Sequence, residues 1–199
     1  MDAQLTALLD ELHEHGVSHD AQQPNRLERL RNLEPESARL LAVLIRAAGA
    51  RRLLELGTSN GYSTIWLADA ARATGGRVTS VDLDPARSRE ARTNLKRAGL
   101  DSDVELRVQD AADALRDSRD GEWDMIFLDA ERPAYSSYWP DLLRVLKPGG
   151  LLAVDNVISH ADQVAEFRSL VEGAAGVETA LAPTGAGLLL VAKEPAQNG

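Results

Sequence analysis

Short continuous apolar runs and longer stretches with an apolar residue every three or four positions alternate along most of the chain. The short runs predict strands buried on both faces of a parallel sheet, and the longer stretches predict amphipathic helices. Five runs are expected to be strands, and two later segments are expected to form a closing hairpin. The expected strands are 51–56, 77–81, 104–108, 123–128 and 151–154, and the hairpin segments are 176–181 and 188–191.

Helical spacing predicts helices ahead of the first strand and between the strands. The expected helices are 3–15 ending near Gly16, a charged helix over 26–33, a helix from Pro35 to Gly49, one from Gly61 onward, and helices over 85–98, 138–146 and 161–172. Strands that alternate with helices require right-handed crossovers. The fold class predicted is α/β, a Rossmann-like doubly wound seven-stranded sheet, mostly parallel with an antiparallel C-terminal strand and helices on both faces.

Length and composition limit the other possibilities. A chain of 199 residues with 44% hydrophobic positions fits one domain. We expect an N-terminal helical extension over 1–33, a core over 34–193 and a tail over 194–199. The net charge of -9 argues against nucleic acid as a partner. The start lacks a signal-peptide pattern and no apolar run reaches the roughly 20 residues that span a bilayer, so we expect a cytoplasmic protein without a membrane partner.

Two glycines, Gly57 and Gly61, mark the turn between the first strand and the following helix, where Ser59 or Asn60 is a candidate cap. In open α/β sheets, ligands bind beyond the carboxyl ends of the strands, where glycine admits a close approach and helix N-terminal amides face an anion. The glycine spacing does not fit a dinucleotide motif, and no lysine follows as in a phosphate loop. The turn therefore predicts a small anionic or zwitterionic ligand, with an ordinary tight turn as the alternative.

Each of the five expected strands ends in an acid. These residues are Glu55, Asp82, Asp110, Asp129 and the pair Asp155 and Asn156. Parallel strands bring such ends to one edge of the sheet. An acid in the position of Asp82 is suited to bind the hydroxyls of a ribose. The hard oxygens of Asp129, Asp155 and Asn156 suit Mg²⁺ or Ca²⁺. The alternative is that Asp155 and Asn156 only cap the following turn.

Together these residues resemble class I S-adenosylmethionine-dependent methyltransferases, and more narrowly the cation-dependent O-methyltransferases of the catechol and caffeoyl-CoA type. The resemblance covers roughly residues 33–193. It implies that the cofactors are S-adenosylmethionine and a divalent cation. Mg²⁺ is the cation expected, and Ca²⁺ or Mn²⁺ are the alternatives. The implied cofactor-binding residues are Glu55, Gly57, Ser59, Gly61, Ser63, Asp82, Leu83, Asp110, Ala111 and Asp129. The implied metal ligands are Asp129, Asp155 and Asn156.

The resemblance also implies methyl transfer to a hydroxyl of a small, catechol-like molecule, with Asp129, Arg132 and His160 as catalytic candidates. A metal-bound hydroxyl has a lowered pKa and stands in line with the sulfonium methyl. Many relatives carry a lysine, proposed as the base, where this chain has Arg132. Arginine stays protonated, so it cannot take the proton, although it can hold an oxyanion or a substrate carboxylate. His160 is the nearest candidate base in the sequence.

Several alternatives stay open. A metal-independent methyltransferase would use Asp155 and Asn156 only structurally. A scaffold protein would bind the cofactor without turnover, as Arg132 hints. The wrong glycine spacing disfavours an NAD-dependent dehydrogenase. The amphipathic helix over 3–15 suits a homodimer with two-fold symmetry.

Overall fold

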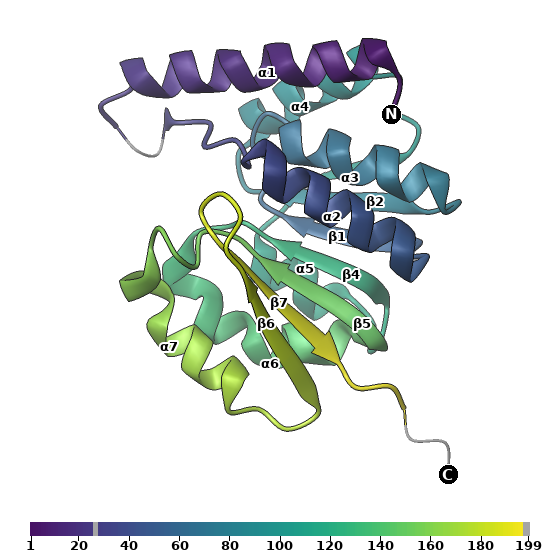
Figure 1. The fold of residues 1–199 in the computed structure, drawn as a ribbon, viewed down its shortest axis with the longest axis vertical. Coiled ribbons are helices and arrows are strands. Elements are labelled where there is room, and N and C mark those ends of the chain that lie inside the picture. The colour runs from purple at the N-terminus through teal and green to yellow at the C-terminus, as the bar shows by residue number, and fades with distance from the viewer. Residues whose placement is uncertain (26–27, 197–199) are drawn as a thin grey trace.

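The computed structural model describes residues 1–25 and 28–196, and its centre is a seven-stranded sheet (Figure 1). The strands are β1 (Arg52–Leu56), β2 (Arg77–Asp82), β3 (Val104–Val108), β4 (Trp123–Leu128), β5 (Leu146–Val154), β6 (Val177–Ala182) and β7 (Leu188–Lys193). Their order is β3-β2-β1-β4-β5-β7-β6. Only β7 runs antiparallel to its neighbours β5 and β6 among the strands described. The predicted sheet, mostly parallel with an antiparallel C-terminal strand, is confirmed.

Helices cover both faces of this sheet. They are α1 (Ala3–Gln22), α2 (Pro35–Ala48), α3 (Tyr62–Ala73), α4 (Pro85–Arg97), α5 (Ala111–Asp117), the 3-10 helix η2 (Arg132–Ala134), α6 (Tyr135–Val145) and α7 (Ala161–Glu172). Side chains of α1 to α4 share one core cluster, and those of α5 to α7 share a second. Across the described chain, no helix combines the length and the apolar character that crossing a membrane requires.

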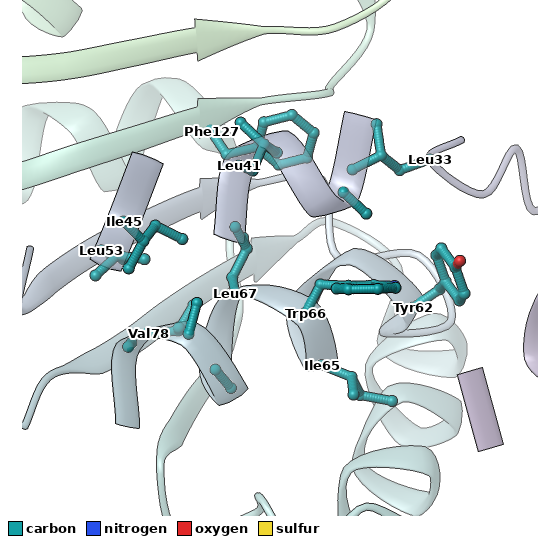
Figure 2. Close-up of a cluster of buried hydrophobic side chains, with 14 of the residues drawn as sticks. Leu33, Leu41, Ile45, Leu53, Tyr62, Ile65, Trp66, Leu67, Val78 and Phe127 are labelled. Atoms are coloured by element: carbon teal, nitrogen blue, oxygen red, sulfur yellow. The ribbon is translucent and has the colours of Figure 1, made fainter. Parts of the chain in front are cut away.

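Strand β1 separates the two core clusters. Because successive strand residues point to opposite faces, Leu53 packs in the cluster with α2 and α3, whereas Leu54 and Leu56 pack with α5 to α7. Figure 2 shows the first cluster, in which Leu41 of α2 and Phe127 of β4 meet the side chains of α3. Full burial of a leucine contributes roughly 1.5–3 kcal/mol. These two cores fix the sheet, and with it the edge where the strands end.

Helix α1 continues through Gly16 to Gln22, so its predicted end near Gly16 is wrong. Leu5, Leu8 and Leu9 of this helix are buried in the first core cluster. Packing of an apolar face stabilises a helix more than one glycine weakens it. Gly16 is itself buried, and it leaves room for the side chain of Asn32.

The helix predicted over 26–33 is wrong for its described part, because residues 29–34 are not helical. Residues 26 and 27 of that prediction lie outside the described chain. Asp20 of α1 supplies the physical reason: its carboxylate accepts the backbone N–H groups of Leu30 at 2.6 Å and Arg31 at 2.8 Å. These donors are thus satisfied without a helix. We call residues 29–34 the strap, since they run from α1 to α2.

Other element boundaries differ in smaller ways. Helix α6 begins at Tyr135, three residues before the predicted start, and β5 begins at Leu146 rather than Leu151. The short helix α5 was not predicted; Asp110 accepts the N–H of Ala112 at 2.8 Å and so caps its start. The predicted end of α2 is confirmed, because Gly49 follows it in a left-handed conformation.

Candidate functional site

A cavity of about 630 Å³ lies beyond the carboxyl ends of β1 to β4. Eight of the ten predicted cofactor-binding residues line it. They are Gly57, Ser59, Ser63, Asp82, Leu83, Asp110, Ala111 and Asp129. Glu55 and Gly61 lie behind this lining. The predicted cofactor-binding residues do not include the strap, Arg87 or Tyr138, which also line the cavity but carry no recognisable motif.

The carboxylate of Glu55 is the centre of a buried hydrogen-bond cluster behind the glycine turn. It accepts hydrogen bonds from Ser63 Oγ at 2.6 Å, Thr64 Oγ1 at 2.5 Å and Ser80 Oγ at 2.6 Å. A further hydrogen bond of 2.6 Å joins Ser80 Oγ to Thr58 Oγ1. Glu55 therefore ties the end of β1 to the first turn of α3 and to β2.

Burial raises the pKa of Glu55 to about 7. The hydrogen bonds from Ser63, Ser80 and Thr64 oppose this rise, and the nearby charge of Asp82 adds to it. The side chain is completely buried. Glu55 therefore changes its charge near neutral pH inside the framework of the turn.

The two predicted glycines permit close backbone approaches. Gly57 has φ +111°, and a Cβ there would lie 2.8 Å from the carbonyl carbon of Asp129, at the end of β4. Gly61 has φ +85°, and its Cβ would lie 3.0 Å from the Cα of Ala91 in α4. Gly57 thus lets β1 end against β4, and Gly61 lets α4 pack on the turn. Gly61 is also the N-cap residue of α3, while Asn60 Oδ1 accepts the N–H of Tyr62 at 3.2 Å.

Asp82 is held in place at the end of β2. One carboxylate oxygen accepts the N–H of Ser59 at 2.8 Å, and the other accepts the N–H of Asp84 at 2.9 Å. Each oxygen keeps a second lone pair. The carboxylate can therefore accept hydrogen bonds from two adjacent hydroxyls of a ligand in the cavity, as the sequence prediction for a ribose requires.

The strap lies across the same cavity and is tied to the glycine turn. Ser59 Oγ donates to the carbonyl of Leu30 at 2.9 Å, and Arg87 of α4 donates to Ser59 Oγ at 2.7 Å. Arg87 also donates to the carbonyl of Arg29 at 3.0 Å. The N-terminal part of the chain therefore forms one wall of the cavity.

A second cavity, of about 610 Å³, lies on the other side of the strap. Its lining combines α1 residues such as His13 with Asp155, Asn156 and His160. Arg31 and Asn32 are the two described residues that line both cavities. The strap thus stands at the junction between the two cavities.

The three predicted metal ligands lie together at this junction. The amide nitrogen of Asn156 donates to Asp129 Oδ1 and to Asp155 Oδ2, both at 3.0 Å. Asp129 lines the first cavity, whereas Asp155 and Asn156 line the second. Burial, followed by the charge of Asp155, raises the pKa of Asp129 well above its ordinary value, and burial also raises the pKa of Asp155.

Several features of this cluster fit a divalent cation. Two carboxylates and one amide are hard oxygen donors from neighbouring strand ends. Asp155 Oδ1 is buried and has no hydrogen-bond partner among the described residues. A cation would need the amide oxygen of Asn156, whereas the amide nitrogen faces the acids here. The described residues contain no group of three or more His, Asp or Glu side chains able to hold a metal, and the fit here depends on two carboxylates and one amide.

Arg132 and His160 flank the acid cluster from different sides. Arg132 is 3% exposed and donates from Nε to Gln163 Oε1 of α7 at 2.8 Å. It lies outside the linings of both cavities, and its charge opposes the pKa rise of Asp129 and Asp155. His160 lines the second cavity, and its Nδ1 lies 2.8 Å from Ser159 Oγ. Their catalytic roles stay predictions.

Strained backbone marks the same region. Within the described residues, the non-glycine residues with positive φ are Arg31 at 53°, Ser59 at 48° and Asn156 at 68°. All of them line one or both cavities. Such conformations cost about 1–3 kcal/mol each and persist where the surrounding contacts enforce them, often at functional sites.

A doubly wound sheet with a glycine turn and acids at its strand ends is typical of proteins that bind nucleoside-type ligands. The O-methyltransferase family model matches residues 2–192. The chain belongs to this O-methyltransferase family. A solved structure, the O-methyltransferase from Bacillus cereus in complex with SAH, superposes with a TM-score of 0.78 at 26% identity, over 94% of this chain and 91% of that one.

Curated relatives share more sequence over a shorter region. The chain is 40% identical to a catechol O-methyltransferase of Niastella koreensis over 130 residues, which is 64% of this chain and 58% of the relative. It is 30% identical to a probable caffeoyl-CoA O-methyltransferase of Dictyostelium discoideum over 145 residues, 70% of this chain and 61% of the relative. The matched region therefore spans about three fifths of the length of these relatives.

The pKa of Glu55 leads to a pH-dependent stability. Since the folded pKa of about 7 exceeds the ordinary 4.5, the contribution of Glu55 is fully present below pH 4.5 and is lost as the pH rises through 7. Between pH 5 and 8, the free energy of unfolding should fall by roughly 2–3 kcal/mol more in the wild type than in Glu55→Gln. Urea unfolding of both proteins at the two pH values checks this, and equal pH dependence would contradict it.

Gly57→Ala should weaken the first cavity's framework. The new Cβ meets the backbone of Asp129, so we expect a loss of roughly 2–4 kcal/mol of stability and displacement of the β1 end. Gly49→Ala is the matched control, because Gly49 also has positive φ but has open space around it. Denaturant unfolding of the two variants separates backbone strain from the clash; an equal loss in both would argue against a special close approach at Gly57.

Proposed function

We propose that the chain is an S-adenosylmethionine-dependent O-methyltransferase that methylates a hydroxyl of a small, catechol-like molecule with the help of a divalent cation. The observation that supports this most is the placement of Asp129, Asp155 and Asn156. They join a cavity suited to a nucleoside to a second cavity suited to an acceptor. Family membership and the SAH complex of the Bacillus cereus neighbour support the same cofactor.

The cofactor would occupy the first cavity. The backbone N–H groups at the start of α3, around Ser63, would face the methionine carboxylate, because the Ser63 hydroxyl already donates to Glu55. Asp82 would accept the ribose hydroxyls, and Asp110 with Ala111 would border the adenine. A carboxylate in place of a pyrophosphate explains why the turn needs no phosphate-binding motif.

The acceptor would occupy the second cavity, with the reacting hydroxyl at the junction. Asp129, Asp155 and Asn156 would hold the cation there, which lowers the pKa of a bound hydroxyl and orients its oxygen when present. The names of the curated relatives support an acceptor with adjacent hydroxyls. The cavity walls would exclude water and keep the acceptor oxygen aligned with the methyl group.

Arg132 would act on charge rather than as a base. It is buried beside two acids and cannot give up its proton at neutral pH. Its guanidinium would balance the negative charge that collects around Asp129 and Asp155. Proton removal would then be left to water or to His160, which borders the second cavity.

A methyl-transfer screen tests the proposed function. Catechols, flavonoids and hydroxycinnamates are incubated with S-adenosylmethionine, with Mg²⁺ or with a chelator. We expect product only with Mg²⁺, and a loss of at least about a hundredfold in Asp155→Ala, because one ligand of the cation is removed. Undiminished activity in chelator and in Asp155→Ala would favour a metal-independent enzyme, and no transfer despite cofactor binding would favour a scaffold.

Replacing Arg132 tests its role in balancing charge. Arg132→Met should lower the rate of methyl transfer about tenfold or more, whereas Arg132→Lys, which keeps a positive charge, should lose less. Arg168→Met on α7 is the matched control, since Arg168 pairs with Glu172 at the surface. Steady-state rates of the four proteins decide this; an unchanged rate in Arg132→Met would show that the charge is not needed.

A further inference from the structure

The side chain of Asn32 is fixed to α1 at the junction of the two cavities. Its Nδ2 donates to the carbonyl of Leu12 at 3.0 Å. Gly16, one turn further along α1, makes this contact possible, because a Cβ at Gly16 would overlap Asn32 Nδ2 and lie 3.0 Å from its Cγ. The lack of a side chain at Gly16 therefore explains why a glycine occurs inside α1: it lets the strap lie against the helix.

The oxygen of the same Asn32 amide lacks a hydrogen-bond donor among the residues described. Asn32 Oδ1 is buried and has no hydrogen-bond partner within the described chain. The orientation of the amide follows from its surroundings, since only the nitrogen can donate to the Leu12 carbonyl. The side chain that carries this unpaired acceptor oxygen lines both cavities. Leaving such a group buried without a donor costs free energy unless a ligand supplies the donor.

We propose that Asn32 is a specificity-determining residue, whose Oδ1 accepts a hydrogen bond from a second hydroxyl of the methyl acceptor. This inference rests on the proposed function. Asn32 borders both cavities, so its side chain stands where the acceptor must meet the cofactor. In a molecule with adjacent hydroxyls, one oxygen receives the methyl group and the other keeps a proton to donate.

We assign this oxygen to a hydroxyl of the acceptor rather than to the ammonium group of the cofactor. The first cavity already offers the carboxylate of Asp129 to that ammonium group. An ammonium group pairs more strongly with a carboxylate than with an uncharged amide oxygen, which leaves the amide oxygen to a neutral donor. By fixing one hydroxyl, Asn32 would determine which of the two oxygens faces the methyl group. It would therefore influence the ratio of the two methylated products.

The first experiment compares Asn32→Ala with the wild type, using 3,4-dihydroxybenzoate as the acceptor. We expect the KM for this acceptor to rise about tenfold and the ratio of the two products to move toward one, while the Kd for S-adenosylmethionine stays within about twofold. Gln22→Ala is the control, since Gln22 is exposed at the end of α1 and lines neither cavity. An unchanged KM and product ratio overturn the proposal. A Kd that rises as much as the KM overturns it too, because the oxygen would then serve the cofactor.

A binding measurement separates this proposal from the proposed function. Calorimetry titrates 3,4-dihydroxybenzoate into the protein saturated with S-adenosylhomocysteine and Mg²⁺. Weaker binding to Asn32→Ala supports the proposal whether or not methyl transfer follows. If the wild type does not bind this acceptor and transfers no methyl to it, both proposals fail; if the wild type methylates it and Asn32→Ala matches the wild type, only the role of Asn32 fails.

Gly16→Ala provides an independent test of how Asn32 is positioned. The added Cβ should displace the Asn32 side chain and reproduce the rise in KM. In the Asn32→Ala background the obstacle is gone, so Gly16→Ala should leave the KM unchanged and raise the Tm, since alanine favours a helix interior over glycine. Equal effects of Gly16→Ala in both backgrounds would contradict the positioning by Gly16.

Discussion

The hydrogen bonds of Glu55 hold β1, α3 and β2 together around the glycine turn. This carboxyl is fully buried, yet it accepts from Ser63 and Thr64 of α3 and from Ser80 of β2. Because those hydroxyls come from two different elements, the position of α3 relative to the sheet depends on one side chain of β1. The helix start, the glycine backbone and Asp82 then face a single cavity.

The N-terminal part of the chain completes both cavities from outside the sheet. Asp20 accepts hydrogen bonds from the strap backbone, and Ser59 joins the strap to the turn. The side chain of Asn32 donates a hydrogen bond to the α1 backbone. Stability and function are linked there, since the same contacts that dock α1 also shape the junction. In the proposed function, this junction would hold an acceptor oxygen within reach of the methyl group.

The sequence allowed the sheet and its ligand edge to be predicted because these depend on local patterns. Apolar runs ending in acids predicted β1 to β4, and the family resemblance placed Asp129 near Asp155 and Asn156, as the structure does. The strap escaped prediction because its path depends on Asp20, about ten residues away, rather than on its own periodicity. Gly16 was read as a helix end for a similar reason: its partner, Asn32, lies on another segment.

The proposed cofactor site depends on Glu55, which lies behind the first cavity and holds the glycine turn in place. Calorimetry of S-adenosylmethionine binding to the wild type, Glu55→Ala and Glu105→Ala tests it most directly; Glu105 is an exposed acid of β3 paired with Arg107. We expect binding by the wild type and by Glu105→Ala, and at least about tenfold weaker binding by Glu55→Ala, because the turn loses its anchor. Equal affinity in all three proteins, or no binding by the wild type, would contradict it.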